Sequence, residues 1–231
     1  MKALRKLLAL PGDLWQMFVT YLPGPFGYWL RWRHWRRRLR ACGPGARIDV
    51  GVHFQNPEWI SLGEHCWIDR FVVILAGAAG GDRITRVKEN PHFRHLPGEV
   101  AIGAHSHIAP YCVISGIGGV QIGACCGIAS HAAVYSYSHH YRNAQDKSDP
   151  HQYAFTPLAR PDQQAMVSGP VVLEDYCAVG LHAVLLPGTT LERGAWVASG
   201  AVVSGTCAAQ NLVHEERKLE HKSLQELVIK T

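Results

Sequence analysis

Residues 169–203 read GPVVLEDYCAVGLHAVLLPGTTLERGAWVASGAVV, with an aliphatic residue at every sixth position from Leu173 to Val203. An α-helix repeats every 3.6 residues, so a period of six disfavours an amphipathic helix and indicates a solenoid of stacked repeats. Earlier in the chain the spacing returns in shorter runs: Leu62, Ile68, Ile74; Ile102, Ile108, Ile114; Ile122, Ile128, Val134; and, more weakly, Ile48, Phe54, Ile60.

Small residues form a second regularity, four positions after the better-registered aliphatics. Cys66 follows Leu62 in this way, and Ala195 follows Leu191. Side chains alternate faces along a strand, so both members of each pair point inward. Six residues then make one flat side, and three sides close a triangular coil of about eighteen residues. We expect about six coils, stacked about 4.8 Å apart into a column of roughly 29 Å.

Two long stretches interrupt the repeat, residues 75–99 and 135–170. Excursions of this length are uncommon and often functional, so we expect them to be loops that leave the column near a site. We therefore divide the chain into a basic arm, residues 1–47; a β-helix, residues 48–205; and a tail, residues 206–231. Leucines on a rough helical spacing predict that the tail is a C-terminal helix.

Charge is concentrated in the arm. Residues 1–47 hold ten Lys/Arg and one acid, a net +9, whereas residues 48–231 hold thirteen Lys/Arg and seventeen acids, a net −4. This division argues against a nucleic-acid partner for the body. Six arginines lie within residues 31–40, interleaved with tryptophans. Residues 21–40 therefore predict either a peripheral contact with an anionic membrane surface or a helical cap with solvated arginines.

Seven cysteines occur without a C-x-x-C pair. Their odd number and scattered positions disfavour a disulfide scaffold and indicate a reducing compartment. No apolar run reaches 18 residues. We therefore expect a cytoplasmic protein, with the inner face of the cytoplasmic membrane as its peripheral contact if the arm binds lipid.

The quoted stretch resembles the hexapeptide-repeat acyltransferases, and residues 60–69 (ISLGEHCWID) and 120–134 (VQIGACCGIASHAAV) carry the same signature. The resemblance covers about residues 48–205. It implies a left-handed parallel β-helix, a homotrimer, and acetyl-CoA or another acyl-CoA as the donor, with no metal. The left hand comes from the resemblance alone, because crossovers between parallel strands are usually right-handed.

Acyl transfer to a hydroxyl needs a base, and histidine suits neutral pH. His139 lies five residues after Val134, the offset of the catalytic histidine in the galactoside and maltose acetyltransferases, which this segment resembles. That similarity implies His139 as the base, with His140 as the alternative one residue along. We expect direct transfer from the donor in a ternary complex. Cysteines at the small inward positions are better interpreted as core residues than as nucleophiles.

The resemblance also implies donor-site residues. It places Leu181 against the pantetheine arm, Ser199 and Ser204 along a CoA channel between adjacent subunits, and His182 on the acceptor side. Ala178 stands where many relatives have Trp, and the usual closing motif is absent after Val203. The segment 135–170 is longer than in the small-sugar enzymes, which indicates a different acceptor.

Relatives with a Pro-Gly and Arg-rich arm resemble enzymes of bacterial surface polysaccharide biosynthesis. We therefore expect an O-acetyltransferase acting on a sugar hydroxyl of such a polysaccharide or its precursor. Two alternatives stay open, an N-acetyltransferase of an amino sugar and a non-catalytic β-helix scaffold. A zinc enzyme of the gamma carbonic anhydrase type is disfavoured, because its histidine spacing is not reproduced here by His105, His107, His131 and His182. The arm is too short for the helical domain of serine acetyltransferases.

Overall fold

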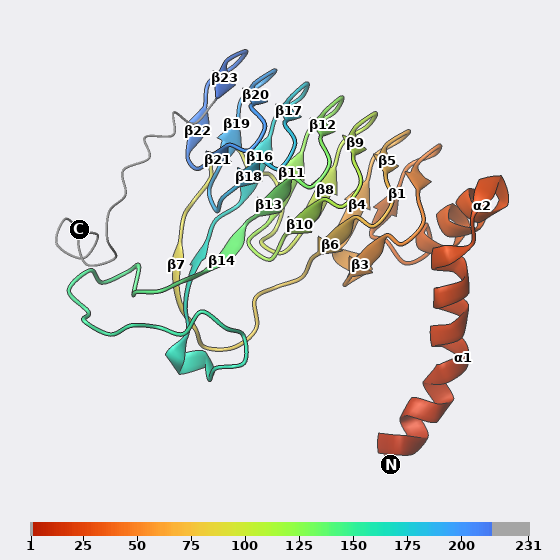
Figure 1. Ribbon diagram of the computed structural model, residues 1–231, viewed down its shortest axis with the longest axis horizontal. Coiled ribbons are helices and arrows are strands. Elements are labelled where there is room, and N and C mark those ends of the chain that lie inside the picture. The colour runs from red at the N-terminus through yellow and green to blue at the C-terminus, as the bar shows by residue number, and fades with distance from the viewer. Residues whose placement is uncertain (1, 214–231) are drawn as a thin grey trace.

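The computed structural model describes the backbone of residues 2–213 and the side chains of residues 11–213. Three all-parallel sheets form a triangular column (Figure 1), and they confirm the predicted left-handed parallel β-helix. Sheet A contains β1 (Ala41–Cys42), β4 (Ile60–Leu62), β8 (Val100–Ile102), β11 (Val120–Ile122), β16 (Val171–Leu173), β19 (Thr190–Leu191) and β22 (Thr206–Cys207).

The chain passes from sheet A to sheet B to sheet C in each coil. Sheet B contains β2 (Arg47–Ile48), β5 (Trp67–Ile68), β9 (His107–Ile108), β12 (Gly127–Ile128), β17 (Ala178–Val179), β20 (Trp196–Val197) and β23 (Leu212–Val213). Sheet C contains β3 (His53–Gln55), β6 (Val73–Leu75), β10 (Val113–Ser115), β13 (Ala133–Tyr135), β18 (Val184–Leu185) and β21 (Val202–Val203).

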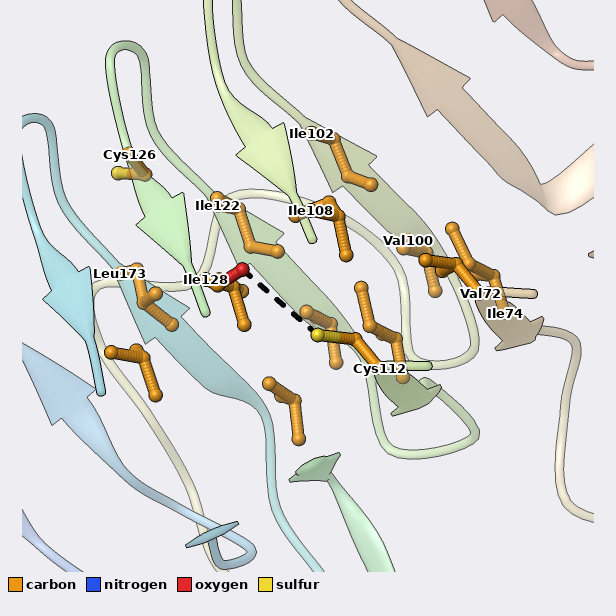
Figure 2. Packing of buried hydrophobic residues seen from close by; sticks show 14 of the residues in the cluster. Val72, Ile74, Val100, Ile102, Ile108, Cys112, Ile122, Cys126, Ile128 and Leu173 are labelled. Carbon is orange, nitrogen blue, oxygen red and sulfur yellow. Dashed lines mark hydrogen bonds between the residues drawn. The ribbon is translucent and has the colours of Figure 1, made fainter. Parts of the chain in front are cut away.

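The six-residue repeat sets the register of the column. Leu173 pairs with Leu191 and Leu185 with Val203, eighteen residues apart as predicted. The aliphatics that carry the repeat stack inside the column, where Ile74, Ile108 and Ile128 are at most 1% exposed (Figure 2). Burying each such side chain contributes about 2 kcal/mol, so the stack is the main source of stability.

The small inward residues lie at crowded corners. Cys66, Cys112, Cys126 and Cys177 are buried beside the aliphatic stack. One position before each of them, the backbone adopts a positive φ, as at His65 (51°). That left-handed conformation costs an L-residue roughly 1–2 kcal/mol and turns the strand direction sharply. It recurs at the corner between sheets A and B and at the corner between sheets B and C.

The corner between sheets C and A is where both long excursions leave the column. They were expected to be loops, but parts of them pair into a small side sheet of β7 (Ile84–Val87), β15 (Ala165–Ser168) and β14 (Tyr137–His140). β14 runs antiparallel to β15, and β15 runs parallel to β7. Two short 3-10 turns, η1 (Pro57–Trp59) and η2 (Pro161–Gln163), lie in connections.

The column extends beyond both predicted boundaries. β1 and β2 begin before residue 48, and β22 and β23 continue the coil after residue 205. A helix over 206–213 is therefore wrong, because Cys207 fills another small inward position and pairs with Leu191. The rest of the predicted C-terminal helix, residues 214–231, lies outside the described residues.

Two helices form the arm, α1 (Lys2–Tyr21) and α2 (Gly24–Trp35). α2 covers the open end of the column, where Trp35 packs edge-on against Phe54 with ring centroids 4.9 Å apart. Buried Arg31 donates hydrogen bonds to the carbonyls of Ile48 (2.7 Å) and Leu22 (2.5 Å). α1 projects away from the column (Figure 1). Over the described range, no helix is both long and apolar enough to cross a membrane.

Candidate active site

His139 and His140 lie on β14, where the chain has just left the column. Ser136 fixes this exit, because its fully buried hydroxyl donates to the Ser115 carbonyl (2.7 Å) and accepts from the Gly118 N–H (2.9 Å). Antiparallel pairing then places His139 opposite Met166 and His140 opposite Ala165. The local alternation of Tyr, Ser and His over residues 135–140 suits a strand with two different faces.

The two histidines differ in their contacts. The Nε2 atom of His139 is buried and has no hydrogen-bond partner among the described residues, and the ring lies 5.4 Å from that of Phe155. Nδ1 of His140 lies 2.7 Å from the Arg142 carbonyl oxygen. The Arg142 backbone N–H also lies 3.2 Å from this Nδ1, so Nδ1 is either a donor to the carbonyl, with the Nε2 lone pair free, or an acceptor from the N–H, with the proton on Nε2. The His140 ring is thus held by the Arg142 backbone, whereas the Nε2 of the partly buried His139 has no partner among the described residues.

A polar cluster that sequence reasoning missed lies further along the same excursion. Asp149 accepts hydrogen bonds from the Tyr153 hydroxyl (2.6 Å), from His151 through Nδ1 (2.7 Å) and from the Asn143 amide (3.1 Å). These bonds, with that of Tyr153 the largest influence, hold the pKa of Asp149 well below its usual value. A cavity of about 480 Å³ adjoins it, lined in part by His151 and Tyr153. The alternate spacing of Asp, His and Tyr at 149, 151 and 153 is the signal that could have indicated the cluster.

A groove of about 450 Å³ crosses the outer face of sheet B, and its lining is mostly apolar. It exists because two neighbouring strands carry no large outward side chain: Gly127 on β12 pairs with Ala178 on β17. His107 borders the groove on one side and Trp196 on the other, with Ser199 at its edge. The absence of Trp at position 178 thus opens this surface.

His107 is also part of an acid–base pair that sequence reasoning missed. Its Nε2 lies 3.3 Å from Oδ2 of Asp69, and its ring stacks on Trp67 at a centroid distance of 4.7 Å. Asp69 is 7% exposed, and its Oδ1 accepts from the Arg70 N–H at 2.7 Å. The groove therefore combines apolar walls with one oriented imidazole.

The residues predicted to bind the donor (Leu181, Ser199 and Ser204) and the acceptor (His182) fall in two places. Leu181, His182 and Ser199 lie together at the corner between sheets B and C, where the Gly200 N–H donates to the Leu181 carbonyl at 2.7 Å. The exposed His182 ring stacks on His131 at 4.9 Å, and the stack continues through Tyr111 to Phe71. Ser204 lies across sheet C, beside a separate cavity at the end of the column.

One chain does not bring the predicted base to the predicted donor corner. Sheet C lies between the donor corner and the histidines. In one coil the chain crosses this sheet from His182 to Leu186. In the neighbouring coil the position that corresponds to Leu186 is Tyr135, which comes just before β14. The four steps from His182 to Leu186 span about 13 Å of extended chain. Sheet C thus separates two parts of the predicted site. The corner with Leu181 and Ser199, beside the groove, lies at one edge of this sheet, and the strand with His139 and His140 begins at the other edge.

Cys66 and Cys112 do not have the environment of nucleophiles. Burial raises the pKa of Cys66 to about 12 and that of Cys112 to about 11. A reactive cysteine needs the opposite shift. Within the part of the chain that the structure describes, no three His, Cys, Asp or Glu side chains are grouped closely enough to hold a metal ion.

No family model matches the chain. A curated relative is the dTDP-4-amino-4,6-dideoxy-D-glucose acyltransferase of Escherichia coli, which is 26% identical over 171 residues, covering 74% of this chain and 75% of the relative. AntD, an N-acyltransferase from Bacillus cereus, has been solved with dTDP and 3-hydroxybutyryl-CoA; it superposes with a TM-score of 0.60 at 20% identity, covering 79% of this chain and 81% of AntD.

A serine-to-alanine variant of AntD, in complex with dTDP-4-amino-4,6-dideoxyglucose and coenzyme A, gives the same TM-score of 0.60 at 20% identity, covering 79% of this chain and 82% of that chain. The likeness to AntD shows the fold. The curated relative confirms the predicted resemblance to sugar acyltransferases and the class of enzyme. The curated relative is named for an amino-sugar acceptor, so it agrees better with the amino-sugar alternative than with the O-acetyl expectation.

Proposed function

We propose that this relative of the hexapeptide-repeat sugar acyltransferases transfers an acyl group from coenzyme A to the amino group of a nucleotide-linked amino sugar. The single observation that carries the proposal is the sequence match to an acyltransferase of a dTDP-linked 4-amino sugar over three quarters of both chains. The groove on sheet B supports it, because a mostly apolar channel suits the pantetheine arm of the donor.

The donor in this proposal is acetyl-CoA. Its arm lies along the groove between His107 and Trp196, with Ser199 at the edge and Leu181 at the adjoining corner. The mostly apolar walls would exclude water from the thioester. Ser204 is too far from this groove to share that part of the donor, so we assign it to the end of the channel towards the nucleotide.

The chemistry is a direct transfer. The amine nitrogen attacks the thioester carbonyl, the C–N bond forms, the C–S bond breaks, and sulfur leaves as the thiolate. The proton lost by nitrogen passes to a histidine and then to the thiolate. We propose His139 or His140 as that group, because both lie on β14 where the chain leaves the column. Backbone N–H groups are the simplest source of stabilisation for the oxyanion.

A homotrimer completes the site in this proposal. The groove and β14 lie on different corners of one column. In a ring of three parallel columns, β14 of one subunit can face the groove of the next. His182, at the corner between sheets B and C beside the groove, then contacts the acceptor.

The compartment in this proposal is the cytoplasm, where acyl-CoA and sugar nucleotides are made. All seven cysteines lie within the described residues, and all are free thiols. Such a set is typical of a reducing compartment.

The test is turnover of the full-length chain with acetyl-CoA and dTDP-4-amino-4,6-dideoxyglucose, followed by chromatography of released CoA. Thiol reagents are avoided because the protein has free cysteines of its own. We expect turnover with the amino sugar and none above background with the matched dTDP-sugar that has a hydroxyl at C4. Equal or faster turnover of the hydroxyl sugar would instead support O-acetylation, and no turnover of either would contradict this acceptor class.

A further inference from the structure

The arm presents an exposed apolar surface that the proposed reaction does not use. Large side chains about half exposed cluster between residues 14 and 29, whereas the inward side chains of the column are buried. We call the following seven residues the aromatic stripe: Leu14, Trp15, Met17, Phe18, Tyr21, Phe26 and Trp29.

The stripe is ordered on two helices. Trp15 stacks on Phe18 on α1 with centroids 5.9 Å apart, and Phe26 stacks on Trp29 on α2 at 5.6 Å. Residues three apart share one face of a helix, so each pair makes a continuous aromatic patch. Of residues 11–21, only Val19 is fully buried. A helix gains most of its stability from packing an apolar face. α1 packs only at its C-terminal end, against α2 and the end of the column, so its other apolar side chains lack a partner within the described chain.

Positive charge lies beside the stripe. Arg33, Arg36, Arg37, Arg38 and Arg40 are all exposed. The Arg33 guanidinium lies over the Trp29 ring at 5.9 Å. Of these five arginines, only Arg40 forms an ion pair within the described residues, with Glu99 at 2.7 Å. Most of the positive charge of residues 31–40 is therefore not neutralised by ion pairs within the described residues.

We propose that the aromatic stripe and its neighbouring arginines bind the surface of an anionic lipid bilayer. Trp and Tyr rings are well placed at the boundary between acyl chains and headgroups, and Arg pairs with the lipid phosphates. A second copy is a poorer occupant, because two arms of +9 would repel each other. The capping role of α2 and the membrane role coexist, since Trp35 and Arg31 face the column while Phe26 and Trp29 face outward.

The surface differs from the one that the sequence indicated. Residues 21–40 were predicted as the contact, but four of the seven stripe residues lie on α1 before residue 21. The arginine-rich segment supplies charge, and the apolar insertion comes mainly from α1. The proposal does not depend on the reaction that the column performs.

The experiment is co-sedimentation of the full-length chain with vesicles of phosphatidylcholine, with and without phosphatidylglycerol. We expect binding to the anionic vesicles and weak binding to the neutral ones. Losing one half-exposed aromatic side chain should weaken binding about fivefold, so Trp15→Ser with Phe18→Ser should weaken it about 25-fold. Arg36→Gln with Arg37→Gln should weaken it by a similar factor, and added salt should weaken it further.

The control is Leu158→Ser, which removes a 93% exposed apolar side chain from the long excursion and should leave binding unchanged. Thermal unfolding of each variant shows whether it is folded, and we expect wild-type melting because every changed side chain is exposed. Wild-type protein that does not sediment, or a Trp15/Phe18 variant that sediments like wild type, would overturn the proposal. Light scattering that finds an oligomer lost in this double variant would assign the stripe to a second copy instead.

Discussion

Filling the groove on sheet B should weaken donor binding without unfolding the column. Gly127 lies on the groove floor, and a Cβ added there would meet no atom within 4 Å. Gly127→Phe therefore introduces a ring into open space, at a strand position that tolerates aromatic side chains. A Phe side chain buries 150–250 Å² when fully covered; if about 80 Å² of it replaces donor contact, the loss is about 2 kcal/mol, or about 30-fold in affinity.

Steady-state kinetics test this prediction. For Gly127→Phe we expect the KM for acetyl-CoA to rise about 30-fold, while the KM for the amino sugar and the melting temperature stay near wild type. Gly80→Phe is the matched control, because Gly80 also has open space around its Cβ but lies in an exposed connection. A folded Gly127→Phe variant with an unchanged KM for acetyl-CoA would refute the placement of the donor in this groove.

Other consequences concern the exit strand and the thiols. Of His139→Ala and His140→Ala, the substitution that removes the base should lower kcat by about 100-fold or more and the other should not; wild-type kcat in both would exclude either histidine. Ser136→Ala leaves the Gly118 N–H without its partner and should cost about 1–3 kcal/mol in urea unfolding, and an unchanged midpoint would contradict its anchoring role. Iodoacetamide at pH 8 should label exposed Cys125 in the native protein before Cys112, whose pKa burial raises to about 11; equal labelling by peptide mass spectrometry would contradict the buried column.

The column could be predicted from the sequence because one rule decides it. Every inward position depends only on residues six apart along the chain, and Leu173 and Val203 obey that rule. The ends were less predictable: Cys207 continues the coil after a shortened turn, so its partner Leu191 lies sixteen residues back and not eighteen. A fixed period cannot detect such a change of spacing.

The side sheet and the groove could not be predicted in the same way. β14 and β15 pair across about 25 residues without a repeat, and β7 joins them from the other excursion. The groove depends on outward residues of separate coils, Gly127 and Ala178, which become neighbours only when the register is known. The histidine pair at 139 and 140 was found from its position after the last aliphatic, but its contacts depend on Arg142 and Phe155, which local sequence does not place.

The central claim is that this chain forms an amide on a nucleotide-linked amino sugar. The most direct measurement is nuclear magnetic resonance of the product formed from acetyl-CoA labelled with ¹³C at the carbonyl. The proposal predicts a carbonyl signal coupled to an amide proton and to the sugar proton at the aminated carbon, and none of it when the protein is omitted. An ester carbonyl coupled to a sugar proton, with no amide coupling, would contradict the claim.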